Sequence, residues 1–545
     1  MAKIRLPQKR GPKQISQLAV LNPGKGLNNF VSDSLIQDTE ASDIMNIQFS
    51  ESGCPTKSYG ITAVGTGLSN APKGLGSLIT SSTRQLLTVD GTSLKYLNGT
   101  VWTAISGASF TSGREVNFVQ ARDTLYIWNG QDAGRKYDGT TLAANTKAPS
   151  AAFGIFYSGY QIVSGVSTQP NRVYISVSTD ASDFTNDPTA ITSSQDPDNS
   201  TDVPGATDFT GTTAPLAQMI DVAKGDGDKI TGFAKFQENL IIFKERSIYQ
   251  LVFDSSGIPV VSQVTASMGA VSHKSIENID NDVFFLSRNG YYVLGNEANY
   301  NTAIRTNELS TRIKPVIETI GASNLSKAAS IYSDFRFYSS VATGGVSTNN
   351  KTITYDKRYQ AWSQLDYIKA NAFTEFIDSS NIKHLYYAAS DEAKVYEIAV
   401  GYSANGTAIN SYWTSKAFDA GSFDGYKRWL DVTLLFRQIT GTVTITIYAD
   451  NNEIVKTTSI SSTTSASGSI GTEIMGSEIF GGFGNTPDGT STNNVPYRVK
   501  INTKSRTLKI KISNANDNET FTLLGMNFAY VPYSRYSFPS SQKIY

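Results

Sequence analysis

The chain has 545 residues with 47 basic and 47 acidic side chains, so its formal net charge at pH 7 is zero. This balance excludes a globally basic nucleic-acid binder and an acidic disordered protein. The single cysteine, Cys54, excludes an intramolecular disulfide and a cysteine-based zinc site. The 44 glycines, 28 tyrosines and 26 phenylalanines are typical of short strands joined by tight turns.

The N-terminal segment 1–32 is basic and contains no acidic side chain. Pro7, Gly11 and Pro12 favour an extended arm, and the segment lacks the apolar stretch of a secretory signal. The arm is either a solvated end or a segment that contacts a partner subunit or DNA, since each cation near a phosphate releases a counterion. Because the rest of the chain is neutral, we favour partner or DNA contact through Lys3, Arg5, Lys9, Arg10 and Lys13.

Residues 33–404 contain repeated strand pairs and tight turns. Asp90-Gly91 and Asn98-Gly99 each follow a short apolar strand, and Asn129-Gly130 and Asp138-Gly139 repeat this design further along the chain. Both dipeptides favour hairpins because their residues tolerate a positive φ angle. Seven such clusters at intervals of roughly 40–65 residues predict a β-propeller of about six to seven degenerate blades, with an irregular array of β-sandwiches as the alternative.

Two segments interrupt the predicted propeller. Residues 185–228 are rich in Pro, Asp, Ser, Thr and Gly, which predicts a long insertion. Glu308–Ile320 carries apolar residues at helical spacing and is the clearest predicted helix, although Pro315 weakens or kinks it.

Residues 405–545 predict a separate antiparallel β-sandwich. Trp429–Phe436, Thr442–Tyr448 and Thr507–Ile512 alternate apolar and polar residues and are rich in β-branched side chains. A Gly/Ser/Thr-rich loop at 461–495 separates two of these strands. Its apolar side chains are covered by the sandwich core or by a neighbouring subunit, which makes them candidates for a gate or an inter-subunit contact: Ile470, Ile474, Met475, Ile479, Phe480 and Phe483.

The C-terminal segment 530–545 is crowded with aromatic side chains. Exposed Tyr and Arg are typical anchors of protein interfaces, while packing back on the chain's own sandwich is an equal alternative. The candidate interface residues of this tail are Tyr533, Arg535, Tyr536 and Phe538.

Sequence motifs for catalysis or metal binding are weak. There is no G-x-S-x-G, H-E-x-x-H or phosphate-binding loop, and the two histidines, His273 and His384, lie far apart in the sequence. Asp196–Asp202 and Asp221–Asp228 are acidic clusters that suit calcium ligation or turns, without an EF-hand pattern. Ser178–Phe184 has a weak likeness to a sialidase Asp-box and fits an Asp-rich turn better. We therefore expect no catalytic site, no metal, no cofactor and no membrane-spanning segment.

One region resembles a known family. Residues 19–62 place an apolar strand before a Gly-Leu-Asn turn, followed by Glu40-Ala41, Asp43–Asn46 and Lys57-Ser58-Tyr59-Gly60. This order resembles the opening of the tail nozzle proteins of short-tailed bacteriophages, which are also called tail tubular, hub or DNA-stabilisation proteins. Lys57-Ser58-Tyr59-Gly60 replaces the family's basic-basic-x-Gly. Asp228–Tyr249 and Gly269–Tyr291 are similar to recurrent blades of such proteins.

The resemblance implies a structural virion protein, assembled in the host cytoplasm into the phage tail. Members of that family form a ring, usually six-fold, that continues the DNA channel, retains packaged DNA and opens for ejection. The implied partners are copies of the chain, a tail adaptor, a tail fibre or spike, and double-stranded DNA bound without sequence specificity. A neutral wall suits such a conduit, because a basic one would hold the DNA. The alternatives are another phage tail component, or a β-propeller that binds or cleaves carbohydrate.

Overall fold

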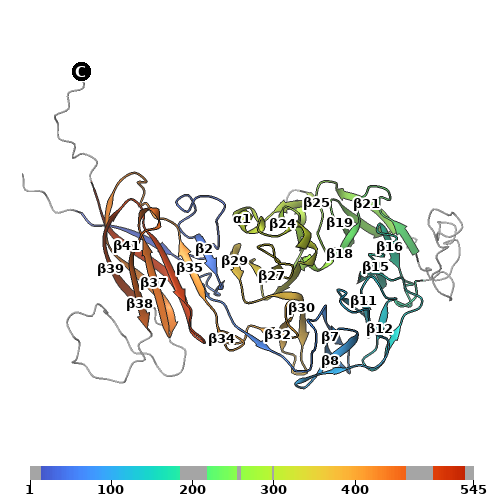
Figure 1. Cartoon of the computed structure of the whole chain (residues 1–545). Helices are drawn as coiled ribbons and strands as arrows, with labels where there is room; N and C mark the ends of the chain where they lie inside the picture. The colour runs from blue at the N-terminus through green and yellow to red at the C-terminus, as the bar shows by residue number, and fades with distance from the viewer. Residues whose placement is uncertain (1–13, 185–217, 255–258, 298–299, 462–494, 534–545) are drawn as a thin grey trace, which may run out of the picture. The chain divides into compact units, whose positions relative to one another are not determined.

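The computed structural model describes residues 14–184, 218–254, 259–297, 300–461 and 495–533. It confirms the predicted all-β class, because strands dominate and the helical segments are short (Figure 1). Two compact units are present and are described separately. The propeller unit comprises Gly60–Lys357 and Leu365–Asn405, and the sandwich unit comprises Met1–Tyr59, Arg358–Gln364 and Gly406–Tyr545.

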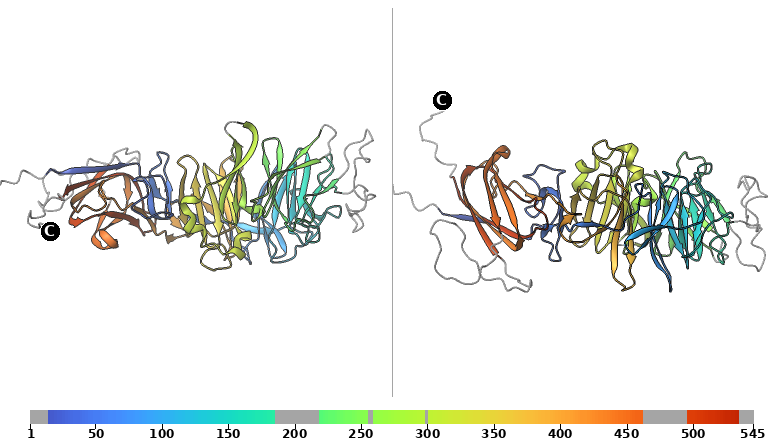
Figure 2. Two further views of the ribbon diagram at one scale, coloured as in Figure 1. Left: turned by 90° about the horizontal axis from the view of Figure 1, so that it is seen from above. Right: turned by 60° about the horizontal axis from the view of Figure 1, so that its bottom comes forward.

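The propeller unit is built from seven sheets, which agrees with the predicted six to seven blades (Figures 1 and 2). The first three blades each contain four strands that are consecutive in the sequence. These strands are β6 (Leu75–Ile79), β7 (Arg84–Asp90), β8 (Ser93–Asn98) and β9 (Val101–Ala104); β10 (Asn117–Ala121), β11 (Thr124–Trp128), β12 (Arg135–Tyr137) and β13 (Leu142–Ala144); and β14 (Phe153–Tyr157), β15 (Tyr160–Ser164), β16 (Arg172–Ile175) and β17 (Gln218–Asp221).

The next three blades repeat the same plan of four consecutive strands. Their strands are β18 (Ile230–Phe236), β19 (Asn239–Lys244), β20 (Ile248–Phe253) and β21 (Pro259–Thr265); β22 (Ile276–Ile279), β23 (Asp282–Ser287), β24 (Gly290–Glu297) and β25 (Tyr300–Glu308); and β26 (Ala329–Ser333), β27 (Arg336–Val341), β28 (Lys351–Asp356) and β29 (Ala361–Leu365). β29 is a strand of this last sheet, although most of it lies in Arg358–Gln364, which is counted with the sandwich unit.

The seventh blade joins the two ends of the ring. Its strand order is β30-β31-β32-β5-β33-β34, so that β5, from the start of the unit, pairs with β32 near the end of the unit. A hydrophobic cluster between the seventh and first blades contains Tyr386 and Val395 on one side and Leu86 and Trp102 on the other. The ring is therefore closed by both backbone pairing and side-chain packing. The strands are β30 (Ala370–Ile377), β31 (Lys383–Ala389), β32 (Val395–Ile398), β5 (Ile61–Ala63), β33 (Ser403–Ala404) and β34 (Thr407–Ala408).

The predicted hairpin turns are confirmed. Gly91 and Gly99 have φ angles of 63° and 61°, in the left-handed region where a side chain is strained, and they connect β7 to β8 and β8 to β9. The blades cannot bury their faces singly, and the apolar clusters accordingly lie between neighbours. Leu87 and Leu94 of the first blade, for example, pack with Leu125 and Ile127 of the second.

The predicted helix over Glu308–Ile320 is too long. β25 extends to Glu308, and only η2 (Thr311–Ile313) and α1 (Lys314–Ile317) are helical. Pro315 occupies the first turn of α1, where its missing N–H costs nothing, so it begins the helix rather than kinking it. The apolar residues Ile313, Val316 and Ile320 are buried as the pattern predicted. The other helical segments are η1 (His273–Ser275), η3 (Ala322–Lys327) and η4 (Asp450–Asn452).

The sandwich unit contains two sheets, with strand orders β3-β4-β41-β36-β39 and β2-β35-β40-β37-β38. β1 also pairs with β41. Trp413 and Trp429, both fully buried, occupy the core. The strands are β1 (Ser16–Leu21), β2 (Ala41–Met45), β3 (Ile47–Phe49), β4 (Pro55–Lys57), β35 (Ser411–Ser415), β36 (Lys427–Thr440), β37 (Thr442–Tyr448), β38 (Ile454–Ser461), β39 (Val495–Ser505), β40 (Lys509–Asn514) and β41 (Thr520–Pro532).

The N-terminal boundaries differ from the prediction. The predicted basic arm, residues 1–32, contains the strand β1, and the predicted propeller start, residues 33–59, contributes β2–β4 to the sandwich unit. The physical reason is that β1 and β4 pair with β41 and β2 pairs with β35, strands that lie beyond the whole propeller in the sequence. The predicted insertion at 185–228 also ends too late, because Gln218–Asp221 forms β17 of the third blade. Residues 185–217 of that insertion lie outside the described residues.

Candidate functional site

Most of the predicted site residues lie outside the described residues. This applies to the basic arm, to the apolar side chains of the 461–495 loop and to most of the aromatic tail: Lys3, Arg5, Lys9, Arg10, Lys13, Ile470, Ile474, Met475, Ile479, Phe480, Phe483, Arg535, Tyr536 and Phe538.

Tyr533 is the tail residue that the structure describes. Its backbone N–H donates a hydrogen bond to the Tyr426 carbonyl at 2.9 Å. The Lys504 ammonium lies 5.0 Å from the Tyr533 ring centroid and 4.9 Å from the Tyr426 ring centroid. Tyr533 thus packs against its own unit while leaving 39% of its surface exposed.

The acidic cluster at 221–228 has protein partners in place of a cation. Asp221 pairs with Arg172 at 2.9 Å, and Asp226 pairs with the buried Lys244 at 2.6 Å. Asp228 accepts hydrogen bonds from the backbone N–H groups of Glu245 and Arg246. Within the described ranges, no group of three or more His, Cys, Asp or Glu side chains is arranged to hold a metal ion. The Asp196–Asp202 cluster lies outside these ranges.

The two histidines occupy different blades and different environments. His273 is partly buried, desolvation lowers its pKa to about 4, and its Nδ1 accepts a hydrogen bond from the Phe233 N–H at 3.3 Å. The ring therefore carries its proton on Nε2. His384 contacts Glu397 at 2.7 Å and Asp378 at 3.4 Å, and the hydrogen bond to Glu397 raises its pKa.

The propeller unit contains an axial cavity of about 350 Å³. Its walls come from the first strands of five blades, β6, β10, β22, β26 and β30, and from η1. Phe118 and Phe373 supply aromatic walls. Lys274 also lines the cavity, and its positive charge is balanced by an ion pair with Glu115 at 2.7 Å. Burial raises the pKa of Glu277 to about 8, so its carboxyl group is mostly protonated at neutral pH. The sequence did not reveal Glu277 as a site residue. The alternation within β22 shows only that the Glu277 side chain lies on the opposite face of the strand from Ile276.

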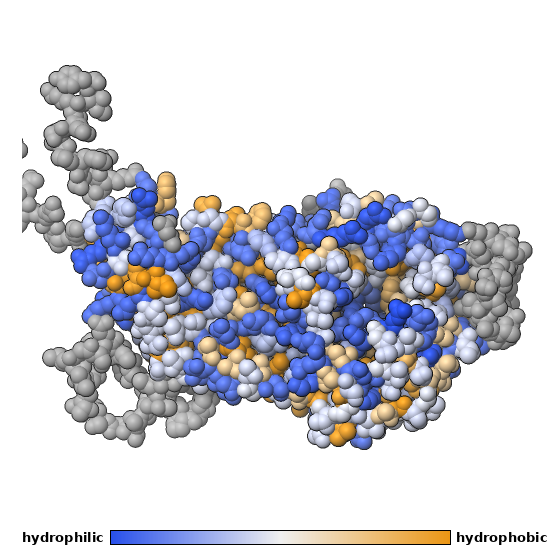
Figure 3. Space-filling model, in the orientation of Figure 1, coloured by the Kyte–Doolittle hydropathy of each residue, from blue (hydrophilic) through white to orange (hydrophobic). Residues whose placement is uncertain are grey.

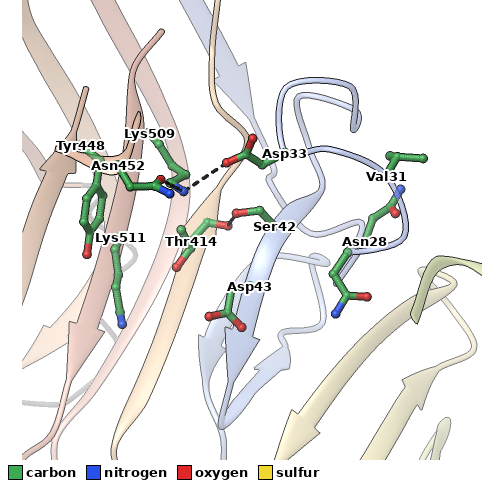
Figure 4. Close-up of a pocket in the computed structure, with 11 residues that line it drawn as sticks. Asn28, Val31, Asp33, Ser42, Asp43, Thr414, Tyr448, Asn452, Lys509 and Lys511 are labelled. Carbon is green, nitrogen blue, oxygen red and sulfur yellow. Dashed lines mark hydrogen bonds and ion pairs between the residues drawn. The ribbon is translucent and has the colours of Figure 1, made fainter. Parts of the chain in front are cut away.

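The sandwich unit contains a second cavity, an open cleft of about 410 Å³ (Figure 4). The segment Asn28–Asp33 forms one side, and the strands β2, β35, β40 and β37 supply the remaining side chains. Figure 4 shows Lys509 joined to Asp33, at 3.1 Å, and to Asn452. Asp43, Thr414 and Lys511 line the same cleft from three neighbouring strands.

Aromatic rings hold both lysines of this cleft in place. The Lys511 ammonium lies 3.8 Å from the Tyr412 ring centroid, and the Lys509 ammonium lies 5.7 Å from that of Tyr448. The contact of Lys511 orients its ammonium while leaving its N–H groups available, whereas Lys509 also donates to Asp33 and Asn452. The cleft thus presents carboxylate, hydroxyl and ammonium groups at fixed positions.

Comparisons with known proteins identify no family. No protein-family model matches the chain, and no curated protein matches it. No helix in the described part of the chain is long and apolar enough to cross a membrane.

The chain is similar to several solved structures. The extracellular domain of BT4673 from B. thetaiotaomicron has 10% identity and a TM-score of 0.39, over 75% of this chain and 49% of that one. BamB from Moraxella catarrhalis has 11% identity and a TM-score of 0.34, over 70% and 97%. PorZ, a surface component of the type-IX secretion system of Porphyromonas gingivalis, has 11% identity and a TM-score of 0.36, over 73% and 46%. The match spans about half the length of the BT4673 domain.

Proposed function

We propose that the chain is a structural subunit of a short bacteriophage tail, a nozzle that continues the DNA channel, retains the packaged DNA and opens for ejection. The observation that supports this most is the role of residues 19–62, the segment that resembles the opening of nozzle proteins. Its strands β2–β4 complete the sandwich unit and its strand β5 closes the propeller ring. The resemblance thus falls on the segment that takes part in both units.

The construction of the propeller unit suits a part that bears load. Each blade shares its apolar surface with its neighbours, and the ring has no open end at the seventh blade. Closure of this kind removes the free strand edges at which a sheet opens most easily. The proposed partners are further copies of the chain in a ring, expected to be six-fold, a tail adaptor, a tail fibre or spike, and double-stranded DNA without sequence specificity.

Immunogold labelling of native particles tests this proposal directly. An antibody raised against residues 60–405 is expected to label the tip of a short tail. An antibody against an unrelated capsid antigen serves as the control for label position. Antigen that is found free in the medium or cell extract, with no labelled particle, would contradict the proposal.

A second candidate function is a β-propeller that binds carbohydrate, and the axial cavity favours it. A concave site that combines aromatic side chains with convergent polar groups can hold a small polar molecule, and the lining of this cavity contains both. The Nε2–H of His273 and the protonated carboxyl of Glu277 are donors on its wall. Thermal-shift screening of mono- and disaccharides, with Glu277→Ala, which removes the donor, and an exposed-site control, Glu238→Ala, measures this. Stabilisation that Glu277→Ala abolishes and Glu238→Ala preserves would favour this reading.

A further inference from the structure

The outer face of the sheet β2-β35-β40-β37-β38 is unusually rich in hydroxyl groups. On β37, the buried side chains Val443, Ile445 and Ile447 alternate with threonines at 442, 444 and 446 that are partly exposed. The neighbouring strands continue this pattern. On these strands, the side chains that share the face of the three threonines in the strand register are Tyr412, Thr414, Thr457, Ser459, Ser461, Lys511 and Ser513.

One row of this face crosses all five strands. In the strand register, Asp43 is opposite Thr414, Thr414 is opposite Lys511, Lys511 is opposite Thr446, and Thr446 is opposite Thr457. Neighbouring strands lie about 4.8 Å apart, so the row has a polar group at each such step, of which Thr414 is buried. It offers acceptors at Asp43, donors at Lys511, and hydroxyl groups that serve as either.

Several groups of this row have unused hydrogen-bonding capacity. The Asp43 carboxylate and the Thr446 hydroxyl make no hydrogen bond or ion pair with any other described residue. The contact of Lys511 is with the ring of Tyr412, which leaves its ammonium N–H groups for a ligand. The row begins in the 410 Å³ cleft, where Asp43, Thr414 and Lys511 are lining residues.

The chemistry of this face favours one class of ligand. A polyanion such as DNA needs excess positive charge, and here the two lysines are matched by Asp33 and Asp43. A protein partner usually inserts large apolar anchors into apolar pockets, which this hydroxyl-rich face does not offer. A neutral glycan brings many hydroxyl groups, each of which can donate to and accept from such a row. The side of the protein drawn in Figure 3 is mostly hydrophilic, with apolar residues in small patches.

We propose that the cleft and the row Asp43–Thr414–Lys511–Thr446–Thr457 form a binding site for a neutral oligosaccharide chain. The ligand lies across the strands, with one end in the cleft. Lys511 and Asp43 hold a sugar ring by donating to and accepting from its hydroxyl groups, and the hydroxyl row contacts the following sugar units. The site belongs to the sandwich unit and is independent of both the axial cavity and the nozzle proposal.

Isothermal titration calorimetry of the full chain tests the site, with cellohexaose, maltohexaose, xylohexaose and chitohexaose as probes. At least one of them is expected to bind. Lys511→Ala removes a charged donor and is expected to weaken binding about tenfold. Thr446→Val removes one hydroxyl with little change of shape and is expected to weaken it less, about threefold.

The matched control is Lys504→Ala, because Lys504 also lies over two tyrosine rings but belongs to β39 of the opposite sheet. It is expected to leave affinity unchanged, and thermal melting confirms that each variant folds. The proposal is overturned when no hexasaccharide binds, or when Lys504→Ala and Lys511→Ala weaken binding equally. A short DNA duplex that competes with the sugar, or binds in its place, also overturns it.

Discussion

Lys57 is a fully buried lysine in the sandwich unit, with 0% of its surface exposed. Its ammonium donates to Asn514 Oδ1 at 2.7 Å and to the Asn516 carbonyl at 2.8 Å. Burial lowers its pKa to about 8, although the charge of Glu519 acts in the opposite direction. This lysine ties β4, from the start of the chain, to the end of β40.

The lowered pKa of Lys57 makes the stability of the protein depend on alkaline pH. In the unfolded chain the lysine keeps its proton to about pH 10.5, while in the folded chain it loses it near pH 8. Between these values the unfolded state binds more protons, so the unfolding free energy rises with pH, by at most about 1.4 kcal/mol per unit. Urea denaturation at pH 8, 9 and 10 is expected to show this rise relative to Lys57→Met. Parallel curves for the two proteins would contradict the assignment.

Glu277 in the axial cavity produces the opposite dependence. Its folded pKa of about 8 lies above its ordinary value of 4.5, so the folded state binds more protons between these values. Stability is therefore fully present below about pH 4.5 and falls as the pH rises toward 8. Glu277→Gln is expected to remove this fall and to be the more stable protein at pH 8. Melting temperatures of both proteins at pH 5, 6.5 and 8 measure the effect, and an unchanged difference across the series would exclude it.

At the level of single residues, the sequence predicted little of the candidate sites. The partners of Lys57 lie far away along the chain, in and just after β40, and no local pattern encodes such a pairing. The role of Lys511 likewise depends on Asp43 and Thr414, which the chain brings to neighbouring strands. The signal that was available is the alternation in Thr442–Tyr448, which correctly predicted a strand with one polar face.

Among the secondary-structure elements, β5 has the largest expected effect on the propeller. The Val64 N–H donates to the Val395 carbonyl, and the Ala399 N–H donates to the Gly60 carbonyl. Because every second residue pair of an antiparallel ladder is hydrogen-bonded, the Thr62 N–H also donates to a carbonyl of β32. Thr62→Pro removes this donor and is expected to cost about 1–3 kcal/mol. Hydrogen exchange is expected to lose protection in β31 and β32.

Thr62→Ser is the control for this substitution, because the Thr62 side chain is exposed and its backbone N–H is kept. The two variants should differ in exchange and in melting temperature. Equal protection of β31 and β32 in both variants would mean that the ring does not depend on its closing strand.

Elements with local signals were the predictable ones. Each blade carries hairpins whose strands are neighbours in sequence, and Asp90-Gly91 and Asn98-Gly99 marked two of them correctly. The strand β5 carried no such signal, since it is three residues long and its partner β32 begins at Val395. The helix prediction failed at its ends because the extended pairing of β25 with β24 continues to Glu308.

At the scale of the whole molecule, the propeller is inserted between β4 and β35 of the sandwich. The two ends of the insertion meet, because the Asn405 N–H donates to the Ile61 carbonyl at 2.8 Å. A fragment of residues 60–405 is therefore expected to fold cooperatively, as judged by circular dichroism and thermal melting. The sandwich predicted from sequence, residues 405–545, lacks β1–β4 and is expected to remain unfolded.

Joining residues 14–59 to 406–545 through a short glycine linker is expected to restore a folded sandwich. The same fusion with Lys57→Pro, which breaks β4, is the matched control. A cooperative melt of residues 405–545 alone would show that the N-terminal strands are dispensable.

The placement of β1–β5 also has a consequence for synthesis of the chain. These strands leave the ribosome first, yet their partners β32, β35 and β41 begin only at Val395, Ser411 and Thr520. The nascent chain must carry unpaired strand edges through most of translation, and pairings of such sequence separation form slowly. A chain that ends before β41 therefore contains the strands of the propeller unit but lacks a central strand of the sandwich unit. Cellular yield is thus expected to depend on chaperones that shield β5 until β32 emerges and β1–β4 until the last strand emerges.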